Sequence, residues 1–254
     1  MIAILLLAVT LAAGAPAADA AKVQNAMKDT AIRMYREKDS FAAIAHLAAE
    51  PDRLAATRAF HEVMHHFYWK EKDLVPAVAF GRAGVQHGLS SAAAVEASDT
   101  SLAEELRSTA KGMTYDLASF TWNGWNEKGI VITESDLKIG LDAAKTNLRL
   151  AVELKKGDLP LCRAHWMLGA QQLSAHDDKG AIASFDKSAQ FAKAAQAEGE
   201  ELLARGDIAI VHLRQSKGKE GAADLEKVKT QLKKVKEGEF FIEQLDTAAQ
   251  VFAK

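Results

Sequence analysis

Residues 161–189 constrain the fold more than any other part of this sequence, because they have the layout of two helices joined by a short turn. Leu168 and Gly169 lie in a stretch rich in apolar residues, and Ala181 and Phe185 lie in the next such stretch. A polar run, His-Asp-Asp-Lys-Gly, separates the two stretches and supplies the turn. Apolar spacing of three and four residues on both sides of a turn predicts an antiparallel helix pair.

This pair resembles a tetratricopeptide repeat, whose pattern is W-x2-L-G-x2-Y, then A-x3-F, then P. The L-G and A-x3-F parts are present, and the chain is most repeat-like over 161–194. Trp166 precedes Leu168 by two residues rather than three, Gln172 replaces the tyrosine, and no proline closes the unit. The resemblance implies an α-solenoid in which the first helix of each pair lines a concave surface that commonly binds peptides.

The rest of the chain repeats this alternation of amphipathic stretches and breaks. Scarce glycine (16) and proline (4), with abundant alanine and leucine, favour helix over sheet. The predicted helices outside the 161–191 pair are 21–36, 40–50, 55–69, 74–85, 101–122, 135–152, 198–214, 221–235 and a last helix ending near 252. Residues 87–100 indicate a connection or a short irregular helix, and Ser101 with Glu104 forms a capping-box pattern. We predict an all-α fold of antiparallel pairs stacked as a tetratricopeptide-like α-solenoid with a C-terminal capping helix.

Residues 1–20 have the pattern of a secretory signal peptide. Residues 2–13 are a continuous apolar run that is too short to span a bilayer, and a small-residue segment ending at Ala20 fits the A-x-A cleavage rule. The charged start is limited to the amino group of Met1, so a buried or membrane-anchoring helix is the alternative. We expect residues 21–254 to form one exported domain, periplasmic or secreted in a bacterium, with no stable membrane span after cleavage.

Composition excludes several classes of function. The formal net charge is −2, which predicts no long-range attraction to nucleic acid. The lysine-rich segment 217–236 is interleaved with acidic residues and indicates a solvated helix face. No glycine-rich phosphate loop, haem motif or nucleophile elbow is present, so the sequence predicts no cofactor. The single cysteine, Cys162, excludes an intramolecular disulfide and is expected to be a partly buried thiol.

Residues 60–69, Phe-His-Glu-Val-Met-His-His-Phe-Tyr-Trp, carry the sharpest chemical signal, an H-E-x-x-H motif. Four-residue spacing on a helix places His61 and His65 on one face, where both could bind zinc, with Glu62 next to a metal-bound water. A catalytic zinc site needs a third ligand. Glu96 is the candidate, because Glu-Ala-Ser-Asp at 96–99 resembles the third-ligand segment of the glutamate-type zincins. The motif therefore leaves open a zinc-dependent metallopeptidase.

The other interpretation of this helix is a binding surface without metal. If Phe60, Val63, Met64 and Phe67 pack inward, the histidines fall on the adjoining face, where they can hydrogen-bond a ligand. We therefore predict a scaffold or binding module for a protein or peptide partner. Its predicted contact residues are Arg58, His61, His65, Tyr68, Arg163 and Trp166. Two other tryptophans, Trp122 and Trp125, are expected to close the core beside a loop.

Overall fold

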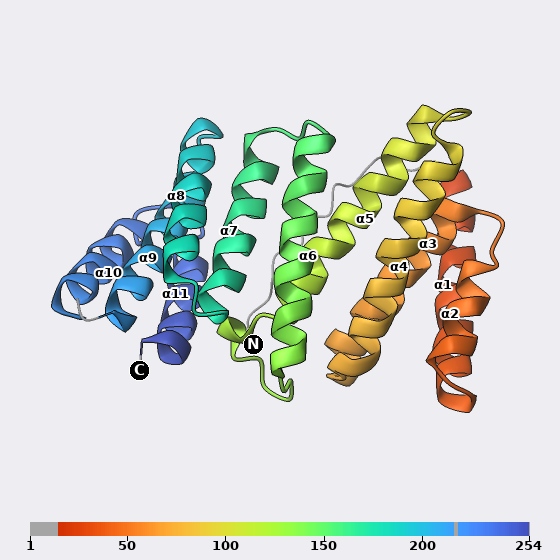
Figure 1. The fold of residues 1–254 in the computed structure, drawn as a ribbon, viewed down its shortest axis with the longest axis horizontal. Helices are drawn as coiled ribbons and strands as arrows, with labels where there is room; N and C mark the ends of the chain where they lie inside the picture. Colours follow the sequence, from red (N-terminus) through yellow and green to blue (C-terminus); the bar gives the residue numbers. More distant parts are fainter. Residues whose placement is uncertain (1–14, 216–217, 254) are drawn as a thin grey trace. The chain divides into compact units, whose positions relative to one another are not determined.

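In the computed structural model, the described part of the chain comprises residues 15–215 and 218–253, and its regular elements are all helices (Figure 1). The α-helices are α1 (Ala15–Glu37), α2 (Ser40–Ala48), α3 (Arg53–His66), α4 (Leu74–Val95), α5 (Thr100–Phe120), α6 (Glu134–Glu153), α7 (Asp158–Ser174), α8 (Asp178–Ala194), α9 (Glu198–Arg214), α10 (Gly218–Leu232) and α11 (Gly238–Phe252). A π-helical turn, η1 (Phe67–Glu71), follows α3, and a 3-10 turn, η2 (Asn123–Trp125), follows α5. Consecutive helices pack in pairs, which confirms the predicted all-α, solenoid-like fold with a last, additional helix.

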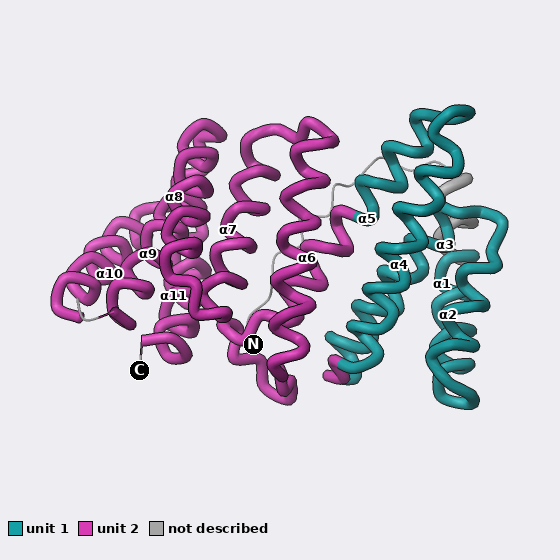
Figure 2. Tube along the Cα trace, in the orientation of Figure 1, with its two compact units in different colours: residues 1–71, 75–110 teal, residues 72–74, 111–254 magenta. Residues whose placement is uncertain are grey.

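The chain divides into two compact units (Figure 2). Unit 1 comprises residues 1–71 and 75–110, and unit 2 comprises residues 72–74 and 111–254. The division falls inside α5, which is one continuous helix. The single repeat domain expected over 21–254 stays a prediction. Most of the predicted signal peptide, 1–20, lies outside the described residues.

Unit 2 shows why the L-G and A-x3-F parts of the repeat pattern are present. Ala181 and Phe185 of α8 are fully buried, and the Phe185 ring lies against Gly169 of α7. A Cβ atom at Gly169 would come within 2.8 Å of that ring, so only glycine lets the two helices approach this closely. Gln172, which replaces the usual tyrosine, accepts a 2.6 Å hydrogen bond at Oε1 from Ser184 of α8.

Three successive turns of unit 2 share one backbone arrangement. Lys155, His176 and Gln196 follow α6, α7 and α8, and each has a positive φ, at 48°, 59° and 56°. The residue after each of them donates its backbone N–H to the carbonyl five residues earlier, at 2.9 Å in all three turns. This is the Schellman motif, which ends a helix with its last carbonyls satisfied. The backbone conformation of these three turns therefore repeats more closely than the tetratricopeptide side-chain pattern does.

A tryptophan cluster fills the end of unit 2 near η2. Trp122, Trp125 and Trp166 are 1%, 8% and 4% exposed, and the Trp122 ring lies 5.4 Å from that of Trp166 between centroids. Phe252 of α11 stacks on Trp122 at 6.1 Å, so the last helix covers this cluster. The prediction that Trp122 and Trp125 close the core is confirmed.

Two sequence-based predictions about unit 1 are wrong. Helix α4 continues to Val95, so residues 87–95 are helical rather than a connection. Its small residues allow close packing: a Cβ atom at Gly88 would lie 3.0 Å from Thr57 Cγ2 of α3. Helix α5 begins at Thr100, where Asp99 caps it by accepting the backbone N–H of Leu102 at 2.9 Å, so Ser101 is not the cap.

Gly169→Ala is expected to lower the free energy of unfolding by about 1–3 kcal/mol, because the added methyl group would overpack against the Phe185 ring. The higher helix propensity of alanine opposes this by up to about 1 kcal/mol. Urea unfolding followed by circular dichroism measures the change. Gly157→Ala is the matched control, since a Cβ atom at Gly157 meets nothing within 4 Å. Equal destabilisation in both variants would contradict the packing argument.

Candidate functional site

Helix α3 carries the candidate site on the face next to its buried side. Asp52 caps the helix by accepting the backbone N–H groups of Leu54 and Ala55. Four residues are fully buried, as the sequence predicted, namely Phe60, Val63, Met64 and Phe67. His61 and His65 are partly exposed, and Glu62 is exposed. The packing of the apolar residues thus fixes the direction in which the two imidazoles point.

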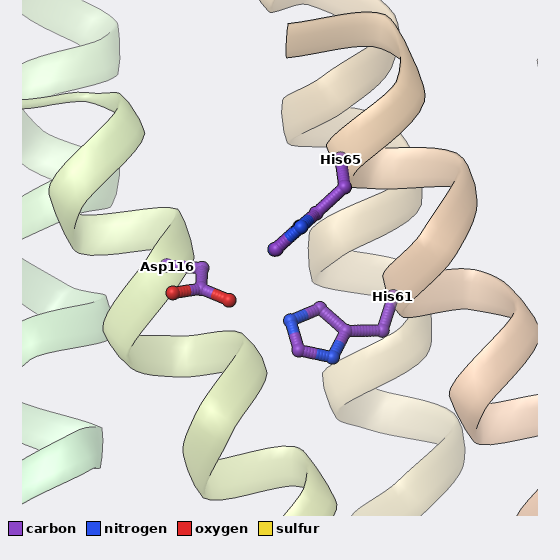
Figure 3. A group of neighbouring side chains, drawn as sticks. All are labelled: His61, His65 and Asp116. Carbon is purple, nitrogen blue, oxygen red and sulfur yellow. The ribbon is translucent and has the colours of Figure 1, made fainter. Parts of the chain in front are cut away.

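His61 and His65 lie one turn apart, and their ring centroids are 4.5 Å from each other (Figure 3). Both histidines are partly buried.

Within unit 1, Arg58 of α3 forms an ion pair with Glu105 of α5, with Nη2 and Oε1 2.5 Å apart. His65 follows Arg58 by seven residues, close to two helical turns, so both lie on one face of α3.

Glu96, the predicted third zinc ligand, has another partner. Its Oε2 atom pairs with Arg107 Nη2, and this hydrogen bond lowers the pKa of the Glu96 carboxyl group.

The π-helical turn η1 changes the phase of the chain directly after the two histidines. His66 turns to a different partner, Glu71, with Nε2 and Oε1 2.7 Å apart. Arg36 of α1 binds the same Oε1 atom at 2.6 Å. Tyr68, within the π turn, is only 1% exposed. π-helical turns occur often at functional sites, and this one ends at Glu71, the partner of His66.

The six predicted contact residues divide into surface and core positions. Arg58 and Arg163 are exposed, and His61 and His65 are partly exposed. Tyr68 and Trp166 are buried, at 1% and 4% exposure. The Trp166 indole Nε1 donates a 2.7 Å hydrogen bond to Asp207 Oδ2 inside the tryptophan cluster. The burial of Tyr68 and Trp166 leaves the charged and imidazole side chains of the predicted set exposed or partly exposed.

Unit 2 contains a second polar group on its first helices, which we name the polar face: Lys111 and Tyr115 of α5, Arg163 of α7 and Glu200 of α9. Arg163 Nε donates to Glu200 Oε1 at 2.9 Å. Burial and the nearby charge of Lys156 lower the pKa of Lys111 to about 8. Burial, with the negative charge of Glu200, raises the pKa of Tyr115.

Cys162 lies beneath the polar face and is not activated. The side chain is fully buried, and its Sγ atom lies 3.4 Å from Ser188 Oγ. Burial raises the pKa of the thiol to about 11, so the nucleophilic thiolate is scarce at neutral pH. His165 stacks on Phe191 at 5.5 Å, and burial lowers its pKa. The sequence predicted a partly buried thiol, and the structure buries it completely.

Comparison with known proteins adds no relative: no protein-family model matches this sequence, and a search of curated proteins finds no match. In the described part of the chain, none of the helices combines the length and the apolar character needed to cross a membrane.

Asp207 is expected to make the stability of the protein depend on pH. Burial raises its pKa from 3.8 to about 7. Between these values the folded state keeps a proton that the unfolded state has released, so the free energy of unfolding falls as pH rises from about 4 to about 7. Each unit of pKa difference corresponds to about 1.4 kcal/mol.

The matched variant is Asp207→Asn, which is neutral at every pH and keeps an oxygen acceptor for the Trp166 indole. Urea unfolding at pH 5 and pH 8 should show a smaller loss of stability in the variant than in the wild-type protein. Parallel pH profiles for the two proteins would show that Asp207 does not titrate in this range.

Lys111 is expected to be an unusually reactive amine. With its pKa lowered to about 8, a substantial fraction of the side chain is neutral at pH 8, whereas ordinary lysines reach this state near pH 10. Trace acetylation at several pH values, resolved by peptide mass spectrometry, measures the midpoint. Lys156→Gln removes one cause of the shift and should raise that midpoint. A wild-type midpoint near pH 10 would contradict this prediction.

Proposed function

We propose that this chain is an exported helical-repeat module that binds a protein or peptide partner on the first helices of its helix pairs. The observation that carries the proposal is the concentration of polar side chains on these helices. In unit 1 they are Arg58, His61 and His65 of α3, and in unit 2 they are the residues of the polar face. Stacked helix pairs commonly use such a face for binding.

Rigid support of these side chains favours the proposal. Arg163 is held by Glu200 of the next first helix, and the residues on both sides of it, Cys162 and Ala164, are fully buried. A side chain that is already held loses little conformational entropy when a ligand binds. The surface is therefore organised before a partner arrives.

The charge of the polar face favours a partner with carboxylate groups. Burial is the main cause of the lowered pKa of Lys111, and the positive charges of Lys156 and Arg163 lower it further, while Asp116 raises it. An acidic side chain or a C-terminal carboxylate placed there would relieve this repulsion. Such a ligand should also raise the pKa of Lys111.

The test uses peptides selected from a displayed random-peptide library on the full chain, with affinities measured by calorimetry. The double variant Lys111→Gln, Arg163→Gln is expected to weaken binding on the order of tenfold or more, since charge-assisted hydrogen bonds are lost. Lys187→Gln is the matched control, because Lys187 is an exposed lysine of the second helix α8. Selected peptides that bind all three proteins equally well would refute the proposed surface.

The alternative function, a zinc-dependent peptidase built on the H-E-x-x-H motif, stays a prediction. Its general base would be Glu62, which is exposed on α3. Its predicted third ligand, Glu96, pairs with Arg107. The binding module has the stronger support, because it draws on side chains in both units.

A further inference from the structure

We infer that helix α2 of unit 1 is an interface through which two copies of this chain associate, with α2 of one copy antiparallel to α2 of the other. Helix α2 is the second helix of the first pair (Figure 1), so the inference is independent of the partner binding proposed for the first helices. It rests on α2 and the residues that flank it, all of which belong to unit 1.

Helix α2 is apolar on its exposed side as well as on its buried side. Its sequence, Ser-Phe-Ala-Ala-Ile-Ala-His-Leu-Ala, contains seven apolar residues among nine, and within the helix only Ala43 and Leu47 are buried. A helix that is apolar on all sides is normally covered on all sides. The contacts of α2 within unit 1 cover one side.

The exposed apolar residues of α2 form one stripe. Phe41 is 82% exposed, and Ala45 and Ala48 are exposed four and seven residues further along the helix. This spacing places the three side chains above one another, on the side opposite Ala43 and Leu47. The terminal helices of a stacked array normally present a polar outer surface, which keeps the array soluble as a single copy. Helix α2 lacks such a surface, which indicates that a second apolar surface covers it.

The stripe is complementary to itself in an antiparallel arrangement. A two-fold axis at Ala45 places Phe41 of one copy opposite the partner's Ala49 and beside the partner's Ala48. The small alanine side chains leave room for the phenylalanine ring, and the two Ala45 methyl groups let the helices approach closely. A large side chain at one end of the helix and small ones at the other therefore suit a second copy of the same helix.

The charges next to α2 favour the same antiparallel arrangement. Lys38 precedes the helix and is exposed, whereas Glu50 and Asp52 follow it. The Asp39 carboxylate, at the same end as Lys38, is held as the helix cap. A two-fold axis at Ala45 brings Lys38 of each copy to the acidic end of the partner's helix, so the contact gains two attractive pairings. A parallel arrangement would instead bring the two lysines together.

The length of α2 predicts a weak dimer. A helix of nine residues is roughly 14 Å long, so the contact lies at the low end of the range of protein interfaces. We expect a dissociation constant on the order of micromolar.

Sedimentation velocity of the full chain, at about 1 to 100 µM, tests the inference. We expect a monomer–dimer equilibrium, and Phe41→Gln should raise the dissociation constant on the order of tenfold or more, because it removes the aromatic anchor. Val152→Gln is the matched control, since Val152 is 61% exposed on α6 of unit 2. Circular dichroism establishes that each variant is folded. A monomer at every concentration, or a dimer that Phe41→Gln leaves unchanged, would overturn the inference.

Disulfide trapping tests the antiparallel arrangement itself. Under mild oxidation, Ala45→Cys should form a covalent dimer, because the two sulfur atoms meet at the two-fold axis. Ala183→Cys, at an exposed position of α8, is the control and should remain uncoupled. Cys162 is fully buried and does not compete. If the chain dimerises but Ala45→Cys couples no faster than Ala183→Cys, the proposed contact is wrong.

Charge reversal separates the antiparallel from the parallel arrangement. Lys38→Glu should weaken the dimer, and adding Glu50→Lys should restore part of the lost affinity, because each pairing then has its charges exchanged. A parallel dimer would show no such restoration and would overturn the proposed geometry. A monomeric chain that co-sediments with phosphatidylglycerol vesicles, and that loses this binding in Phe41→Gln, would overturn the inference in favour of a membrane contact.

Discussion

The packing of bulky side chains against glycine sets the distances between the helices of unit 2. Gly169 of α7 receives the Phe185 ring, and a Cβ atom there would approach the ring to 2.8 Å. The last helix uses the same device twice, because Phe241 and Leu245 of α11 lie against Gly199 and Gly206 of α9. These contacts position the first helices and hence the side chains on them. The polar face, the tryptophan cluster and the buried thiol all depend on this spacing.

The two units hold their first helices by a similar polar interaction. In unit 1, Arg58 of α3 binds Glu105 of α5, and in unit 2, Arg163 of α7 binds Glu200 of α9. Exposed ion pairs of this kind contribute little to stability, typically less than about 1 kcal/mol. Their effect is to fix the direction of two long arginine side chains. Each pair also neutralises charge next to a group of titratable residues.

Apolar periodicity was sufficient to predict most of the fold. Helix pairs and a last helix followed from spacings of three and four residues, since a helix buries one stripe of its surface. The prediction failed over 87–95, where alanine, serine and glycine suit either a loop or a closely packed helix. Only the neighbouring surface of α3, which leaves no room beside Gly88, distinguishes the two. The small residues of this segment do not by themselves distinguish a loop from a closely packed helix.

The candidate site was predictable only within one helix. The four-residue spacing of His61 and His65 placed them together, and their ring centroids are 4.5 Å apart. The sequence-based assignment of side chains to the buried or exposed face of each helix also assumed regular α-helices throughout. The π turn at 67–71 breaks that assumption and buries Tyr68, while the tryptophan cluster buries Trp166. Both departures arise from tertiary packing, which a single helical period does not describe.

The burial of Cys162 bears on how copies of this protein can associate. The chain has one cysteine, fully buried, and the pKa of its thiol is raised to about 11. A covalent dimer would require this sulfur to reach the surface as a thiolate, and its environment opposes both steps. Folded copies of the chain are therefore expected to associate through non-covalent contacts and not through a disulfide, in reducing and oxidising surroundings alike.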